Sequence, residues 1–113
     1  MYVRIARFEG GTIDAIVAEA EDVRRGFVAA GSGEKSQYFP KELTDRVGRM
    51  EMLVDRERGS IAILLYCDSL ADVREVDRIM DGMAPQREGW GKRVSSDVYE
   101  VVVDEARSGT PAR

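Results

Sequence analysis

The sequence predicts an α+β domain in which two helices cover one face of a four-stranded antiparallel sheet. Three observations support this prediction. The patterned segments follow the order strand, helix, strand, strand, helix, strand over nearly all 113 residues. Four segments show the two-residue period of strands, and two show the 3.6-residue period of amphipathic helices. The strands carry apolar side chains on both faces, and two helices can cover only one face, so the sheet needs a further partner.

The first strand is expected at residues 2–9, where apolar side chains occur in both alternating sets. Such two-sided apolar character is typical of a central strand. Gly10 and Gly11 end this strand, and Thr12 is a suitable N-cap for a helix that ends near Gly31. The outer face of this helix carries alternating charges, as a solvated surface does. Its inward side is formed by apolar residues at helical spacing: Ile13, Ile16, Val17, Ala20, Val23 and Phe27.

Residues 31–46 form the least regular stretch, with one short helical turn expected after Pro40. A connection of this length often lines a site, although an ordinary surface loop explains it as well. A hairpin follows, with strands expected at residues 48–55 and 60–67 and with Gly59 available for positive φ in the turn. Because the second of these strands is the most apolar, it should lie beside the first strand at the centre of the sheet.

The second helix is expected to begin after Ser69, whose side chain can cap it, with Asp72 three residues later. Pro85 and Gly89 mark its end, and the last strand is expected at residues 94–104. The inward stripe of this helix consists of Leu70, Val73, Val76, Met80 and Met83.

This order of elements makes two split βαβ halves within a single domain, residues 1–106, followed by a flexible tail at residues 107–113. Right-handed crossovers place both helices on one side of the sheet, which is the ferredoxin-like βαββαβ arrangement. The other side would hold large apolar groups from one alternating set or its opposite-phase neighbours: Tyr2, Phe8, Leu53, Leu64, Tyr66, Val98 and Val102. Leaving such a face exposed forgoes on the order of 10 kcal/mol. We therefore expect a homodimer that joins these faces into an α/β barrel.

Composition argues against several classes of function. A net charge of −4 and a pI near 4.9 argue against a nucleic-acid-binding protein. No apolar run reaches the roughly 20 residues that span a bilayer, and the first residues read as a strand instead of a secretory leader, so no membrane partner is expected. The single cysteine, Cys67, cannot form an intrachain disulfide, which favours a cytoplasmic location.

The chain also contains no histidine and no asparagine. The commonest zinc and haem ligand is therefore missing, and nucleophilic sites that pair serine or cysteine with histidine are excluded. The carboxylates are scattered, without the spacing of a calcium-binding loop. We expect no metal site and no cofactor.

Three segments carry a family resemblance: residues 2–8 (YVRIARF), residues 63–69 (ILLYCDS), which run straight into a helix, and residues 96–102 (SDVYEVV). In these strands the chain resembles the dimeric α/β-barrel superfamily, and most of all its antibiotic-biosynthesis-monooxygenase-like domains. The resemblance implies a dimer with a pocket beside each sheet for flat aromatic or polyketide-like compounds. Some relatives oxidise quinol-type substrates with molecular oxygen and without metal or flavin. Relatives that depend on histidine or asparagine use residues that this chain lacks.

The expected function is that of a small-molecule-binding dimer, with cofactor-independent monooxygenation of a flat aromatic or quinol-like compound as its implied activity. A non-catalytic module of the same fold, binding a metabolite or another protein, is the alternative. The substrate-binding candidates are Arg7, Tyr66 and Trp90, and the pattern identifies no catalytic residue.

Each candidate also has a structural interpretation. Trp90 could stack on a planar ligand or fill the core, and Tyr66 could bind a substrate oxygen or pack at the dimer interface. Cys67 could be a reactive thiol, but its sequence neighbours favour a small buried apolar side chain. Charged residues on apolar strands could form ion pairs between subunits, act on a substrate or lie at solvated edges of the sheet: Arg4, Arg7, Glu51 and Glu100.

Overall fold

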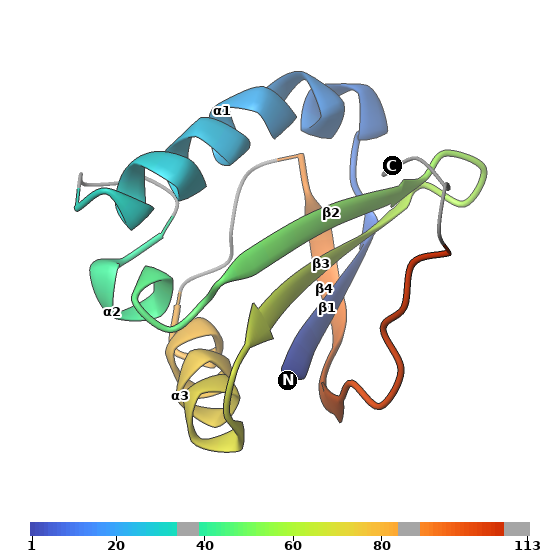
Figure 1. Cartoon of the computed structure of the whole chain (residues 1–113). Helices are drawn as coiled ribbons and strands as arrows, with labels where there is room; N and C mark the ends of the chain where they lie inside the picture. Colours follow the sequence, from blue (N-terminus) through green and yellow to red (C-terminus); the bar gives the residue numbers. More distant parts are fainter. Residues whose placement is uncertain (34–38, 84–88, 108–113) are drawn as a thin grey trace.

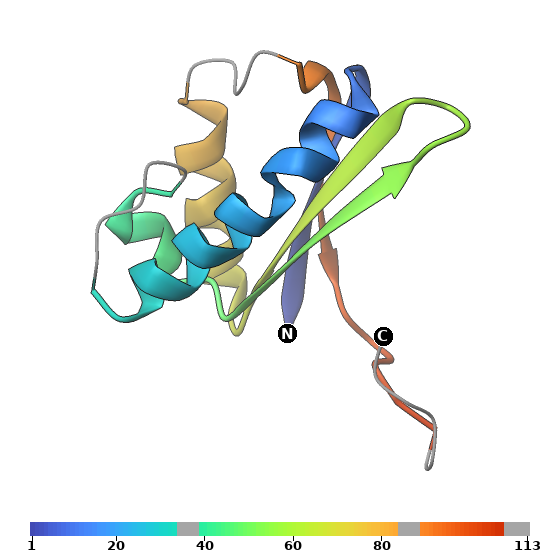
Figure 2. The ribbon, with the colours of Figure 1, turned by 90° about the horizontal axis from the view of Figure 1, so that it is seen from above.

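The computed structural model of the chain describes residues 1–33, 39–83 and 89–107. It is an α+β fold whose four-stranded antiparallel sheet has the order β2-β3-β1-β4 and whose helices lie on one side of the sheet (Figures 1 and 2). The elements are β1 (Tyr2–Gly10), α1 (Ile13–Gly31), α2 (Lys41–Thr44), β2 (Arg49–Asp55), β3 (Ser60–Cys67), α3 (Leu70–Asp81) and β4 (Gly91–Glu100).

Each helical connection is split by a strand from the other half of the chain. Helix α1 leads from β1 to β2, and β3 lies between these two strands. Helix α3 leads from β3 to β4, with β1 between them. This interleaving is consistent with a ferredoxin-like fold. The four strands and the two main helices follow one another along the chain in the predicted order. The short α2 directly follows Pro40, as the proline predicts.

The strand register shows which alternating set of side chains faces the helices. Ala6 pairs with Ile63, and both are buried in the core beneath the helices. Ile5 pairs with Leu64, and both point to the opposite side. Alternation within one strand does not reveal the register between strands, so the expected outward set combined residues from both sides. Three of its members belong to the helix-facing side: Tyr2, Phe8 and Val98.

The core lies between the sheet and the helices. The N–H of Asp72 donates to Ser69 Oγ at 3.1 Å, which fixes the start of α3 and confirms the predicted cap. Leu70 at the first position of α3 and Val17 on α1 are exposed, although inward positions were expected for both. The most deeply buried apolar side chains come from all layers: Ile16, Val23, Leu43, Leu65, Val73 and Val76.

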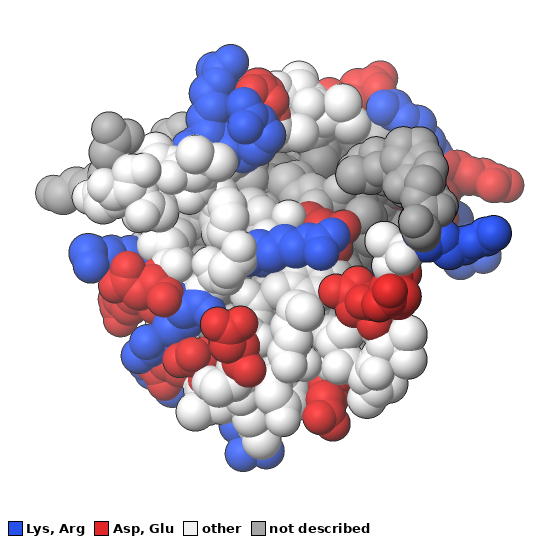
Figure 3. Space-filling model, in the orientation of Figure 1, with Lys and Arg blue, Asp and Glu red and all other residues white. Residues whose placement is uncertain are grey.

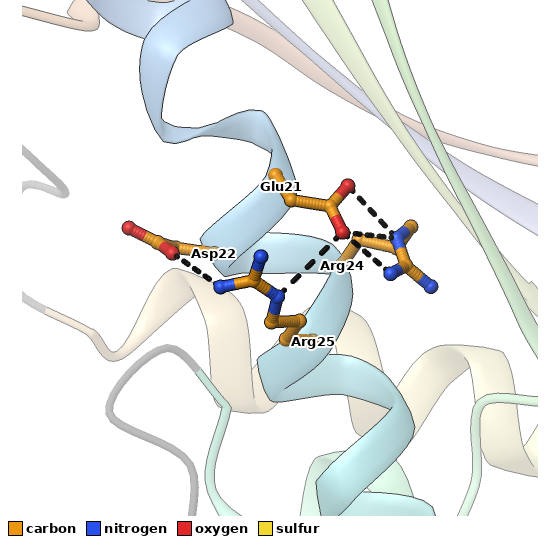
Figure 4. A network of polar contacts seen from close by, with 4 residues as sticks. All are labelled: Glu21, Asp22, Arg24 and Arg25. Carbon is orange, nitrogen blue, oxygen red and sulfur yellow. Dashed lines mark hydrogen bonds and ion pairs between the residues drawn. The ribbon is translucent and has the colours of Figure 1, made fainter.

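Acidic and basic side chains are interspersed over the surface that Figure 3 shows. On the outer face of α1, four of them form a network (Figure 4). Arg24 Nη2 lies 2.5 Å from Glu21 Oε1, and Arg25 lies 3.6 Å from Glu21 and 3.5 Å from Asp22. The hydrogen bond from Arg24 lowers the pKa of Glu21. Because all four side chains are exposed, the network adds little stability, and the predicted solvated face is confirmed.

The last strand differs from the prediction at both ends, since it covers Gly91–Glu100 instead of residues 94–104. At its start, Gly91 has a φ of +83°, and a Cβ there would lie 2.1 Å from the carbonyl oxygen of Glu9. Only glycine fits this approach. At its end, the N–H of Val101 donates to the carbonyl oxygen of Met1 at 2.9 Å. Strand β1 begins next to Met1, so beyond this point β4 has no partner strand in the described part of the chain, and the hydrogen-bond ladder between β1 and β4 ends.

Some expectations concern residues outside the described ranges. They are the helix-ending Pro85 and residues 108–113 of the expected flexible tail. Among the described residues, no helix has the length and apolar character needed to cross a lipid bilayer.

Two valines offer a matched test of the core. Val76 on α3 is 0% exposed and Val28 on α1 is 58% exposed. We expect Val76→Ala to lower the free energy of unfolding by about 2–3 kcal/mol, because it removes buried methyl groups and leaves a cavity. Val28→Ala should change it by less than about 0.5 kcal/mol. Urea denaturation of both variants measures the difference, and equal effects would contradict the assignment of the core.

Candidate functional site

The side of the sheet opposite the helices carries side chains from all four strands. We call this surface the reverse face. It consists of Val3, Ile5 and Arg7 on β1, Arg49, Glu51 and Leu53 on β2, Ala62, Leu64 and Tyr66 on β3, and Ser95, Asp97 and Tyr99 on β4. The two central strands supply most of its apolar groups, and the two outer strands supply most of its charges. Leu53 is 50% and Tyr99 49% exposed, so large apolar groups remain in contact with water at its edges.

Tyr66 is held at one end of the reverse face by two charged neighbours. Its hydroxyl donates to Glu51 Oε1 at 2.6 Å, and the Arg49 guanidinium lies 5.2 Å from the centre of its ring. Burial, reinforced by the adjacent Glu51 carboxylate, raises the pKa of Tyr66 to about 12. The phenol is therefore protonated at neutral pH, and its hydroxyl is already engaged as the hydrogen-bond donor to Glu51.

Arg7 lies on the same face as Tyr66 but away from it. The Arg7 side chain is half exposed, with Nη1 at 4.0 Å from Asp97 Oδ2. Tyr66 lies opposite Val3, four residues along β1 from Arg7, which separates the two positions by about 13 Å along the strands. The structure thus places two candidate residues on one surface without bringing them together.

Trp90 lies on the other side of the sheet, just before β4. It is 6% exposed, and its ring packs edge-to-face on Phe8 with the ring centres 6.1 Å apart. Gly89 directly precedes Trp90, and its carbonyl oxygen accepts a hydrogen bond from the N–H of Thr12 at 2.7 Å. This bond holds the backbone before Trp90 in place. This position agrees with the core interpretation of Trp90. Its buried Nε1 nevertheless has no hydrogen-bond acceptor among the described residues, and buried polar groups normally have one.

The most deeply buried charge is Arg4, for which the sequence suggested an ion pair but not its partners. Arg4 is 1% exposed, and its Nε donates to Asp77 Oδ1 on α3 at 2.9 Å. Ser96 Oγ donates to the same Asp77 oxygen at 3.1 Å, and Asp81 lies 3.5 Å from Arg4 Nη2 and 2.9 Å from Arg93 Nη1. This network fastens α3 to β1 and β4. For Arg4, the expectation of an ion pair between subunits is wrong, because its partners lie in the same chain.

The sequence carried one signal for this network. Asp77 and Asp81 are one helical turn apart, so they lie on the same side of α3. A buried arginine requires paired charges, and such a pair of aspartates can supply them. Neither pattern says which strand residue meets which helix residue, because that depends on how α3 packs on the sheet.

The remaining candidate groups have little chemical reactivity in this structure. Cys67 is buried, and burial, with Asp72 and Asp68 nearby, raises the pKa of its thiol to about 11. It is therefore a protonated, small apolar side chain at neutral pH. Within the described ranges, no three histidine, cysteine, aspartate or glutamate side chains are grouped so that they could hold a metal ion.

The raised pKa of Tyr66 has a measurable consequence. An ordinary tyrosine in the unfolded chain ionises near pH 10, whereas Tyr66 in the folded protein ionises near pH 12. The stability that the protonated phenol contributes is complete below about pH 10 and is lost as the pH rises toward about 12. We expect Tyr66→Phe to abolish this part of the alkaline loss of stability, measured by urea denaturation at a series of pH values. Tyr99→Phe is the matched control, and equal effects of the two changes would contradict the assignment.

Comparisons of the chain with models of known protein families, with curated proteins and with solved structures found no match. The resemblance to dimeric α/β-barrel proteins therefore stays a prediction, and the geometry described above is the basis for any proposal about function.

Proposed function

We propose that this chain functions as a self-associating module, a homodimer in which the reverse faces of two sheets pack together into an α/β barrel. The observation that carries the proposal is the apolar character of the reverse face. Ile5 and Leu64 are only partly buried and lie at its centre beside the buried Val3, and the half-exposed Leu53 and Tyr99 extend it outward. Covering these groups stabilises the protein by removing apolar area from water, at about 25 cal/mol per Å². A contiguous apolar surface of this kind marks an interaction site.

The charges on the reverse face support the same proposal. Arg7 lies 4.0 Å from Asp97, and Arg49 lies 3.5 Å from Glu51. Each positive group is thus matched by a negative group of its own chain. Since an unpaired charge is costly to bury, these pairs allow a second copy to cover the face without leaving an uncompensated charge.

A leucine pair tests this assembly. Leu64 lies at the centre of the reverse face, and Leu70 is an exposed residue at the start of α3 on the helical side. In a two-fold dimer each substitution occurs twice in one interface. We expect Leu64→Glu to raise the dissociation constant of the dimer about a hundredfold or more, as for a central interface residue. Leu70→Glu should leave it unchanged.

The measurement is sedimentation velocity over a dilution series from high to low micromolar protein. Circular dichroism of both variants tests whether they are folded. A wild-type protein that sediments as a folded monomer throughout the series overturns the proposal. So does a Leu64→Glu variant that associates as tightly as the wild type.

Binding of a small aromatic molecule is a second candidate function, favoured by the Nε1 of Trp90, which has no acceptor among the described residues. A buried N–H without an acceptor is unusual, and a ligand oxygen could supply the missing hydrogen bond. The activity that the resemblance implies, oxidation of a quinol-type compound by molecular oxygen without a bound cofactor, is the finer form of this candidate. The protonated states of Tyr66 and Cys67 favour binding over catalysis, since neither group is available as a base or a nucleophile at neutral pH.

Trp90 is the single tryptophan of the chain and so reports on its own surroundings. If an aromatic ligand accepts a hydrogen bond from Nε1, we expect flat phenols or quinols to shift the tryptophan fluorescence and to raise the melting temperature. Trp90→Phe should weaken this ligand binding about tenfold, because it removes one hydrogen bond. A library of such compounds that causes no shift, together with no oxygen uptake on quinols, would rule this candidate out.

A further inference from the structure

A run of three valines follows directly after β4. We call Val101–Val103 the valine segment. Val101 makes the last backbone hydrogen bond to the first residue of the chain, and the two valines that follow are each 82% exposed. These are the highest exposures among the large hydrophobic side chains of the described residues. β-Branched residues favour extended strands that pack on a neighbouring strand. Within the described residues, Val102 and Val103 have no strand beside them.

The valine segment leaves the sheet on the side of the reverse face. Figure 2 shows the chain after β4 running away from the sheet on the side opposite the helices, and in Figure 1 it also turns away from β4. Asp104, the residue after the segment, acts electrostatically on Tyr66, one of the residues of the reverse face. The segment therefore projects into the space that a second protein molecule on the reverse face would occupy.

The flat area of the sheet indicates that the reverse face by itself makes a small interface, which an added contact would enlarge. β3 has 8 residues, so a sheet of four strands about 4.8 Å apart, at about 3.3 Å per residue, has a flat footprint of about 500 Å². Stable protein interfaces bury about 800 Å² on each partner. An additional apolar element beside the face would enlarge this contact.

We propose that the valine segment is an arm that docks on a second copy of this chain. The inference rests on the dimer described under Proposed function, and it adds a second contact region to it. In a two-fold assembly each copy contributes one arm and receives the other, so the contact occurs twice. Burying Val102 and Val103 against the partner removes from water the two most exposed large apolar side chains of the described chain.

The test compares two double variants. Val102→Asp/Val103→Asp changes the arm, and Val17→Asp/Val28→Asp changes two exposed valines on α1, which lies on the other side of the sheet. Valine and aspartate have similar helix propensities, so the control should stay folded. We expect the arm variant to raise the dimer dissociation constant about tenfold or more, and the control to leave it unchanged, in sedimentation experiments.

A second measurement does not depend on a disruptive substitution. A photoreactive amino acid replaces Val103 in an equal mixture of isotopically labelled and unlabelled chains, and mass spectrometry separates links within one chain from links between chains. We expect links between labelled and unlabelled chains at protein concentrations where the dimer is populated. Links confined to one chain, or an arm variant that associates as tightly as the wild type, overturn the arm while leaving the dimer of reverse faces in place. A wild-type protein that is monomeric in sedimentation overturns both proposals.

Discussion

The constraint on which the structure depends is that its central strands are apolar on both sides while its helices cover only one. The burial of β3 alternates strictly, with Ile61, Ile63, Leu65 and Cys67 buried and the residues between them only partly covered. A sheet of this composition stabilises its domain by packing the helices on one side, and it keeps apolar area in contact with water on the other. Packing of the helices on one side of the sheet thus determines the fold. The proposed assembly is inferred from the apolar groups of the reverse face.

The two sides of the sheet also treat their charges differently. On the helical side, Arg4 is almost fully buried and takes its partners from α3, so removing Asp77 would leave a buried cation with weaker compensation. On the reverse face, the pairs of Arg7 with Asp97 and Arg49 with Glu51 are partly exposed and contribute little to the stability of a monomer. Pairs that contribute little to the free monomer are nevertheless useful in an interface, because they allow burial without an unpaired charge. The helical side therefore uses charge to hold its own elements together, and the reverse face is suited to receive a partner.

What the sequence could predict depended on whether the signal was local. The strand at Ser60–Cys67 and the cap at Ser69 were predicted correctly because periodicity and capping are properties of neighbouring residues. The end of β4 was not, because Val102 has the side chain of a strand residue but has no strand beside it in the described part of the chain. Likewise, Arg4 and Arg7 belong to opposite alternating sets of the first strand, and the sequence did not reveal which set faces the helices. The packing of α3 on that side makes Arg4 a buried structural residue and leaves Arg7 on the reverse face.

The candidate site residues show why residue type alone is a weak guide to chemistry in a small domain. The Tyr66 hydroxyl donates a hydrogen bond to Glu51, and Cys67 is a buried thiol, so both are engaged in structural roles. A reaction requires a group with a free hydrogen-bonding or acid–base capacity that a substrate can reach. Within the described residues the buried N–H of Trp90 has no acceptor, but an indole N–H only donates a hydrogen bond and takes no part in proton transfer. Any chemistry at that position would therefore come from the bound molecule, and the contribution of the protein would be to orient it and to exclude water.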